Sequence, residues 1–127
     1  MGKTEVLLML LKAKQMHLEW RSHAEHLIKG MELSDAKAPV DDRCCEFGKW
    51  YYGPGKSCLG FLNHYELVLE THRVMHAVYR QIHDLALQNN LKEAQGRLLE
   101  LAQASDALLD AIELLEQELL TSPEYPD

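Results

Sequence analysis

The sequence lacks the long apolar run that a membrane span needs. No stretch approaches the roughly 18 consecutive apolar residues that would suggest a spanning helix. The apolar opening segment, residues 7–20, is too short and contains Lys12 and Lys14. It also lacks a small-residue cleavage site, so we expect no signal peptide. These absences predict a cytoplasmic protein with no membrane partner.

Clustered positive charge is also missing. The chain carries 13 Lys and Arg against 20 Asp and Glu, a formal net charge of -7. Binding to nucleic acid depends on clustered Lys and Arg that displace counterions from phosphates. The acidic balance therefore argues against a nucleic-acid partner and equally against an anionic membrane surface.

Cysteine is scarce and odd in number, whereas histidine is abundant. Three cysteines without a secretion signal favour reduced thiols over a disulfide framework. Seven histidines in 127 residues are a first indication of a metal site.

No segment alternates apolar and polar residues with the two-residue period of a strand, but three long segments have helical periodicity. The first has apolar positions 6, 10, 13, 17, 20, 24 and 27 and ends near Gly30. A polar stretch with Pro39 follows, then a short helix that begins near Asp41 or Asp42, and a break at residues 53–55.

The second long helix is predicted from about Ser57 to Asn90, with inner positions 65, 69, 72, 76, 79, 83 and 86. The third occupies about residues 91–121, and Asn90 and Glu93 have the spacing of a capping box at its start. A chain of 127 residues suits one domain with one core. We therefore predict a single all-α domain over residues 1–127, an antiparallel four-helix bundle with an additional shorter helix.

The helical periodicity predicts that three histidines lie on the inward faces of the first two long helices. His17 falls on the apolar stripe of the first helix, and His72 and His76 fall on that of the second. Two histidines four residues apart lie on one helix face, so both imidazoles can reach one ion. Buried imidazoles need polar partners, and Zn²⁺ binds four ligands drawn mostly from His and Cys.

The short segment offers the missing fourth ligand. Cys44 and Cys45 precede a run of aromatic residues, and the helical phase leaves open which thiol points inward. Phe47, Trp50 and either Tyr51 or Tyr52 are expected to bury this segment as a lid, and Gly48 to permit close approach to a neighbouring helix.

Each of these residues also has an ordinary structural interpretation. A lone inward histidine is more often a hydrogen-bonded core residue, and a buried cysteine is often a small hydrophobic residue. We expect His23, His26 and His64 to be solvated, and His83 to be a core residue or a neighbour of a ligand. Cys44 and Cys58 are expected to be ordinary thiols.

Three motifs together resemble a known family. They are His17-Leu-Glu-Trp20, Cys45-Glu-Phe-Gly-Lys-Trp50-Tyr-Tyr-Gly53 and His72-Arg-Val-Met-His76. Over about residues 10–90 the chain resembles the bacterial chemoreceptor zinc-binding domain. The resemblance implies Zn²⁺ bound by His17, Cys45, His72 and His76, and so selects Cys45 over Cys44. It gives supporting roles to Trp20, Phe47, Gly48, Trp50 and Tyr51.

The resemblance also implies a function. Members of the family commonly form homodimers and usually accompany an output domain, such as a chemoreceptor signalling region or a diguanylate cyclase. This chain has no room for such a domain, so we expect a free-standing member that signals through a partner protein. The broad leucine-rich face of the last helix is compatible with a second copy or with a thick core.

A zinc ion with four protein ligands has no open position for catalysis, so we expect a sensor and not an enzyme. The signal is zinc itself or an oxidant such as hypochlorite, with Cys45 as the redox-reactive residue.

Two other functions are compatible with a helical bundle. A hemerythrin-like di-iron carrier needs bridging carboxylates, but no histidine here has an acidic residue four positions after it or Glu three before. A purely structural interaction bundle would bind no metal and would be indifferent to chelators.

Overall fold

The structure is a computed structural model that describes residues 2–30, 41–43 and 45–123, and the regular structure of these residues is entirely helical. The helices are α1 (Lys3–Ile28), α2 (Glu46–Tyr52), α3 (Pro54–Leu59), α4 (Tyr65–Leu87), α5 (Leu91–Gly96) and α6 (Leu98–Thr121). Pro39 and Cys44, for which the sequence made predictions, lie outside the described residues. None of the helices is long and apolar enough to cross a membrane, among the residues searched.

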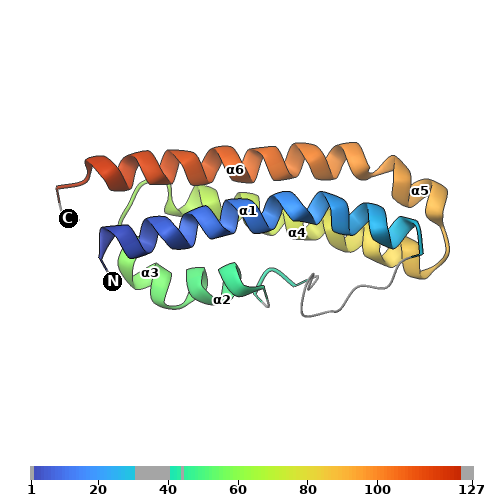
Figure 1. Cartoon of the computed structure of the whole chain (residues 1–127), viewed down its shortest axis with the longest axis horizontal. Helices are drawn as coiled ribbons and strands as arrows, with labels where there is room; N and C mark the ends of the chain where they lie inside the picture. The colour runs from blue at the N-terminus through green and yellow to red at the C-terminus, as the bar shows by residue number, and fades with distance from the viewer. Residues whose placement is uncertain (1, 31–40, 44, 124–127) are drawn as a thin grey trace.

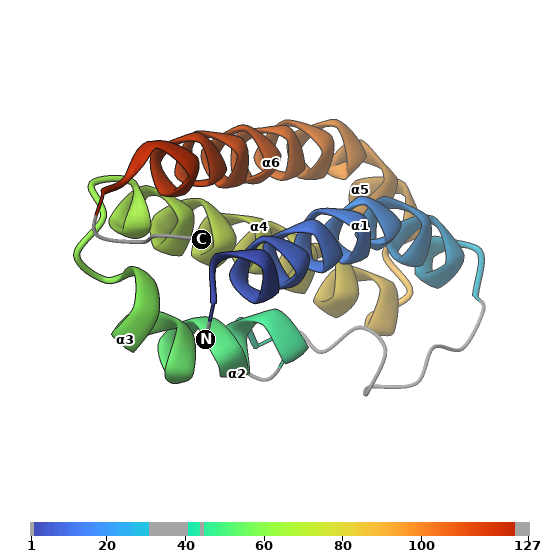
Figure 2. The same ribbon diagram turned by 60° about the vertical axis from the view of Figure 1, so that its left-hand side comes forward.

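The helices form the predicted antiparallel bundle. In Figure 1, α1 runs from one end to the other, α2 and α3 return along its side, α4 runs outward again and α6 returns. The short α5 turns the chain between α4 and α6, as the rotated view in Figure 2 also shows. The start of α1 and the end of α6 meet, since Lys3 Nζ donates to the Leu120 carbonyl at 3.5 Å. The fourth side of the bundle is therefore the broken pair α2–α3.

The predicted apolar stripes form most of the core. In α1 the buried positions include Val6, Leu10, Ala13, His17, Trp20 and Ala24. In α6 they include Leu101, Leu108, Ile112, Leu115 and Leu119. Each fully buried large apolar side chain contributes roughly 1.5–3 kcal/mol. This burial holds the long helices in a fixed rotation about their axes, and that rotation directs His17 inward.

The stripe predicted for α4 is correct near its centre and wrong towards its end. Tyr65, His72, His76 and Tyr79 are buried, but positions 69, 83 and 86 are only half-buried. The last buried position is Ile82, three residues after Tyr79, where the predicted stripe continued to position 83. Cys45 at the start of α2 contacts His72, and Tyr51 near its end bonds Tyr65, so α2 runs back along α4 from His72 towards the start of that helix.

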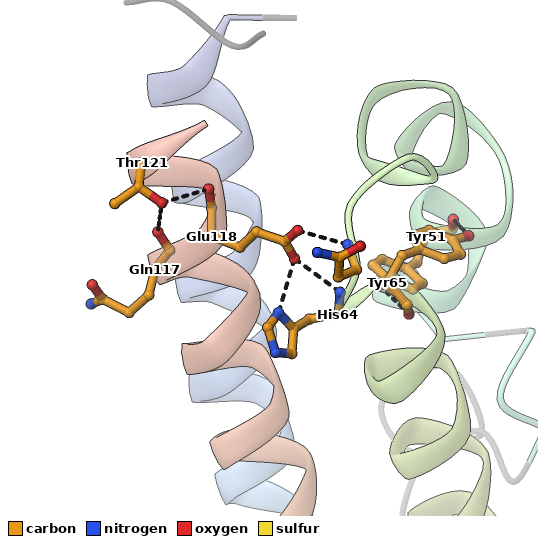
Figure 3. A network of polar contacts seen from close by, with 7 residues as sticks. Tyr51, His64, Tyr65, Gln117, Glu118 and Thr121 are labelled. Carbon is orange, nitrogen blue, oxygen red and sulfur yellow. Dashed lines mark hydrogen bonds and ion pairs between the residues drawn. The ribbon is translucent and has the colours of Figure 1, made fainter. Parts of the chain in front are cut away.

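One long helix from Ser57 to Asn90 was predicted, and the structure has two helices separated at residues 60–64. The Glu118 carboxylate accepts hydrogen bonds from the Asn63 and His64 amides, at 2.7 and 2.9 Å (Figure 3). These two backbone amides come just before Tyr65, the first residue of α4, so the carboxylate lies at the positive end of that helix and stabilises its start. The break thus depends on a residue of α6.

The end of α4 follows from Asn89. This residue has φ = 60°, the left-handed conformation that commonly follows a helix. The backbone amide of Asn90 donates to the Leu85 carbonyl at 2.8 Å, and the backbone amide of Asn89 donates to the Ala86 carbonyl at 3.0 Å. This pair of hydrogen bonds is a Schellman motif. Gly30 ends α1 with φ = 80°, as its sequence position predicted.

The predicted third long helix is also divided, at Arg97, into α5 and α6. The capping box expected at its start does not form, because no side chain caps the backbone there. Instead the Asn90 amide nitrogen donates to the Glu93 carboxylate, side chain to side chain, at 2.8 Å.

Candidate metal centre

Cys45 occupies the N-cap position of α2, where its backbone is extended (φ -74°, ψ 156°). Its sulfur accepts a hydrogen bond from the Gly48 amide at 3.2 Å and lies 3.6 Å from the Asp42 carbonyl, to which the thiol donates. The helix therefore begins at Glu46, four or five residues later than predicted. Because an N-cap side chain folds back over the first turn, this position fixes the direction of the sulfur.

Gly48 makes this local structure possible. A Cβ atom at Gly48 would lie 1.8 Å from the Asp42 carbonyl oxygen and 3.3 Å from Arg43 Cα. Close approach at Gly48 was predicted, but to a neighbouring helix. The structure places it against the turn just before α2. That turn and the first turn of α2 thus wrap around the sulfur.

His17 is oriented by the backbone of its own helix. Its Nδ1 lies 2.7 Å from the Ala13 carbonyl oxygen. Since a carbonyl only accepts, Nδ1 carries the proton and Nε2 presents a lone pair. Nε2 is buried and has no hydrogen-bond partner among the described residues. Metal-bound histidines usually have this arrangement, in which the second ring nitrogen donates to a backbone carbonyl.

His17, Cys45, His72 and His76 converge at the centre of the bundle. One donor atom from each lies within 4.8 Å of all the others, and all four residues are buried. The His17 and His72 ring centroids are 5.0 Å apart at 85°, and those of His72 and His76 are 4.5 Å apart at 72°. Steeply inclined rings allow their nitrogens to point to a common centre.

The donor types, and the distance between two of the donors, fit Zn²⁺. A tetrahedral ion with Zn–N and Zn–S bonds of about 2.0–2.1 and 2.3 Å separates its ligand atoms by roughly 3.3–3.6 Å. Cys45 Sγ and His72 Nε2 are 3.4 Å apart. No carboxylate belongs to this group among the residues searched, whereas a di-iron site needs bridging carboxylates.

Burial sets the protonation of the metal-free cluster. Loss of hydration lowers the pKa of His17 to about 4 and that of His72 to about 2, with further lowering from the neighbouring histidines. Loss of hydration likewise raises the pKa of the Cys45 thiol to about 11, against the lowering effect of its backbone hydrogen bonds. These two imidazoles are therefore neutral near pH 7 and ready to bind a metal, while the thiol must first lose its proton.

Aromatic side chains surround the cluster. The Trp20 ring lies 4.5 Å from that of His76, and the Phe47 ring lies 5.1 Å from that of His72. Tyr51 is fully buried beside Phe47. Trp50 is only partly buried and packs on Gly55, where an added Cβ would meet its ring at 3.1 Å. Trp20, Phe47 and Tyr51 thus exclude water from the donors, and Trp50 joins α2 to α3.

The lid is fastened to α4 by two tyrosines. Tyr51 Oη donates to the Tyr65 carbonyl and Tyr65 Oη to the Tyr51 carbonyl, both at 2.8 Å (Figure 3). The two rings stack at 4.5 Å with 7° between their planes. This reciprocal pair holds the end of α2 while Cys45 holds its start.

Sequence reasoning did not identify the groups that orient the donors. The Ala13 and Asp42 carbonyls belong to the backbone, which leaves no signal in residue type, and the role of Tyr65 depends on tertiary pairing. His23 and His26, which were expected to be solvated on polar or boundary faces, are half-buried. His64 is 37% exposed and its Nδ1 lies 2.9 Å from the Glu118 carboxylate. His83 is half-buried, 3.6 Å from the carboxylate of Asp84, and Cys58 is half-buried in α3.

An all-helical bundle with a buried cluster of three imidazoles and one thiol defines a class of metal-binding domain. Comparison with family models gives a match to the chemoreceptor zinc-binding domain over residues 17–83, just over half of the 127 residues. The chain belongs to the chemoreceptor zinc-binding domain family. The matched segment contains all four residues of the cluster. Searches of curated proteins and of solved structures found no match.

Proposed function

We propose that His17, Cys45, His72 and His76 hold one Zn²⁺ and that the chain, as a single domain of 127 residues, is a sensory module. The observation that carries this is the convergence of four buried donor atoms within 4.8 Å. Four protein ligands fill a tetrahedral site and leave no position for the water that a catalytic zinc needs. The role is therefore regulatory and not enzymatic.

Two signals are compatible with this site, zinc occupancy and oxidation of Cys45. Zinc keeps the sulfur as thiolate, the form that oxidants attack. With hypochlorous acid the thiolate sulfur gains oxygen to become sulfenic acid, and the chlorine is reduced to chloride. Oxidation would weaken a Zn–S bond and the hydrogen bond that the sulfur accepts from the Gly48 amide, and so would loosen the start of α2.

The output passes to a partner protein, for which the family suggests a chemoreceptor or diguanylate cyclase system in the cytoplasm. Assembly as a homodimer belongs to the same proposal and is supported by leucines that α6 exposes. Leu99 is 70% exposed, Leu114 47% and Leu120 49%. Light scattering during gel filtration should give twice the chain mass of 14.6 kDa, and a single chain mass at micromolar concentration would contradict the homodimer.

Zinc content tests the site directly. Elemental analysis of the purified protein should find about one zinc per chain, and His72→Ala should bind much less, since it removes one of four ligands. His83→Ala is the matched control, because His83 lies in the same helix, α4, but outside the cluster, and it should retain its zinc. Less than about half an equivalent in the wild type would refute the site.

Hypochlorite titration tests the redox signal. Zinc release from the loaded protein is followed with a colorimetric chelator, and Cys58→Ser should release zinc as the wild type does. Cys45→Ser, loaded with zinc and compared per zinc bound, should show no release at the low oxidant doses that empty the wild type. If both release zinc in parallel, Cys45 is not the sensing residue.

A further inference from the structure

A polar cleft opens beside the cluster, between the turn that precedes α2 and the outer side of α4. It has a volume of about 520 Å³. The turn contributes Asp41, Asp42 and Arg43, and α4 contributes Arg73, His76 and Arg80 among others. Most of these side chains are exposed, but His76 is only 2% exposed. A candidate ligand of the metal thus forms part of the wall of the cleft.

Two members of the wall connect the cleft to Cys45. His76 belongs to the group whose donor atoms lie within 4.8 Å of one another. The Asp42 carbonyl lies 3.6 Å from Cys45 Sγ. Cys45 itself is 2% exposed. A molecule that contacts His76 from the cleft is therefore separated from the sulfur by little more than one imidazole ring.

Two guanidinium groups flank His76 on its own helix. Arg73 and Arg80 lie three residues before and four residues after it, so all three share one face of α4. Arg43 lies across the cleft with its guanidinium 5.1 Å from the centre of the Tyr52 ring. The charges of Arg73 and Arg43 both act on the Tyr52 hydroxyl and oppose the rise of its pKa, which burial causes. Guanidinium groups from both walls therefore converge on one region.

The acidic residues of the cleft either accept a hydrogen bond from a neighbouring residue or lie farther from His76. Asp41 accepts from the Arg43 amide at 2.8 Å, and the Asp42 carboxylate accepts from the Tyr52 hydroxyl. Asp84 lies eight residues beyond His76, roughly 12 Å along the helix. The cleft as a whole is lined by three carboxylates and three guanidinium groups, and Arg73 also lies 3.3 Å from Glu70. The attraction for anions is therefore local to His76, which Arg73 and Arg80 flank on its own helix face.

We propose that this cleft is the entrance by which small anions reach Cys45, with Arg43, Arg73 and Arg80 as the groups that attract them. The class of ligand is a small oxyanion or carboxylate, such as hypochlorite. The inference rests on the proposed function only in taking Cys45 as the reacting residue. The preference of the cleft for anionic over neutral molecules does not depend on how tightly the protein binds zinc.

Two alkylating reagents of nearly equal size provide the test. Iodoacetate is an anion and iodoacetamide is neutral, and in both reactions the sulfur bonds carbon as iodide leaves with the electron pair. The rate of each is measured at Cys45 by mass spectrometry in Cys44→Ser protein, metal-free and zinc-loaded. Cys58, on α3 and away from the cleft, gives the intrinsic ratio of the two rates within the same sample.

The ratio of the iodoacetate rate to the iodoacetamide rate should be roughly 3- to 10-fold higher at Cys45 than at Cys58 at low salt. In 0.5 M salt the ratio at Cys45 should fall towards the ratio at Cys58. Arg73→Gln/Arg80→Gln should lower the Cys45 ratio at least about threefold. Arg97→Gln is the matched control. Arg73 forms an exposed ion pair with Glu70, three positions away, at 3.3 Å. Arg97 forms an exposed ion pair of the same kind with Glu100 at 3.1 Å.

Equal ratios at Cys45 and Cys58 would overturn the proposal, as would a Cys45 ratio that the double variant leaves unchanged. It is also overturned if neither reagent alkylates Cys45 while both alkylate Cys58. Circular dichroism confirms that each variant keeps its helices. Because zinc content is measured separately, a protein that binds no zinc but keeps the charge preference would refute the metal site and leave the entrance intact.

Discussion

Cys45 differs from the histidines of the cluster in the proton that it must lose. Its pKa is raised to about 11 by burial, so the metal-free protein holds a thiol, whereas zinc binds a thiolate. The pKa values of His17 and His72 are lowered to about 4 and 2, and these imidazoles already lack the second proton at neutral pH. The sign of the linkage is therefore proton release, and tighter zinc binding as the pH rises.

About one proton should be released per zinc at pH 8, where even an unperturbed histidine is neutral. Isothermal titration calorimetry in buffers of different ionisation enthalpy measures this number. Release of two or more protons by the wild type would show that a histidine is charged in the metal-free site.

Gly48 is the residue whose replacement should disturb the sulfur most selectively. Alanine there places a Cβ 1.8 Å from the Asp42 carbonyl oxygen, so the turn before α2 must move and carry away a contact of Cys45. Gly48→Ala should weaken zinc binding at least tenfold and lower the unfolding free energy by about 1–3 kcal/mol.

Gly96→Ala is the matched control, since no atom lies within 4 Å of the position of its added Cβ. This change should leave zinc affinity unchanged and alter stability by less than about 1 kcal/mol. Competition with a chromophoric zinc chelator measures both affinities. Equal affinities of the two variants would show that the turn is not needed to position the thiol.

At the scale of helices, Glu118 joins α6 to the start of α4. Its carboxylate accepts from the Asn63 amide, the His64 amide and His64 Nδ1, at 2.7 to 2.9 Å (Figure 3). Desolvation raises the pKa of Glu118, but these hydrogen bonds outweigh it and hold the pKa below its ordinary value of 4.5. A carboxyl with a lowered pKa stabilises the fold above pH 4.5, and this contribution is lost as the pH falls further.

Glu118→Gln should lower the unfolding free energy by about 1–3 kcal/mol at pH 7, measured by urea denaturation. The difference from the wild type should shrink as the pH drops below 4.5, because the wild-type carboxyl is then protonated too. Glu113→Gln, an exposed change of the same kind on α6, should cost less than about 0.5 kcal/mol. A deficit of Glu118→Gln that persists unchanged at pH 3 would mean that charge plays no part in this contact.

The helices could be predicted wherever their cause is local. The period of apolar residues gave the inward direction of His17, His72 and His76, and Gly30 ends α1 as its residue type indicated. The break at residues 60–64 could not be predicted, because it depends on Glu118, a residue 54 positions away from His64.

Helical periodicity likewise could not decide which of the two adjacent cysteines, Cys44 or Cys45, points inward. Only the motif Cys45-Glu-Phe-Gly pointed to Cys45, and the structure gives a physical reason for the motif. The cysteine caps α2, and the glycine three positions later donates its amide to the sulfur and leaves space for the Asp42 carbonyl. A backbone carbonyl has no signature in sequence, so Asp42 and Ala13 remained unrecognised.

For the molecule as a whole, the cluster unites three sides of the bundle. Its members come from α1, from the cap of α2 and from α4, whereas α6 contributes none. The attachments of α6 are different, for example the ion pair of Lys14 with Glu116 at 2.7 Å and that of Arg21 with Asp106. Zinc should therefore tie α2 to α1 and α4, and its loss should loosen the lid before it loosens α6.

The dependence of global stability on zinc gives a count of the ions that the fold holds. An ion bound only by the folded chain adds about 1.4 kcal/mol to the unfolding free energy for every tenfold increase of free zinc above the dissociation constant. Urea denaturation at buffered free zinc concentrations should give this slope for the wild type, and binding of zinc to unfolded cysteine and histidine can only reduce it. His72→Ala, which keeps three of the four donors, should need much higher zinc before any slope appears. A wild-type stability that does not change with zinc would mean that the four donors form an ordinary hydrogen-bonded core, and the bundle would then be a purely structural one.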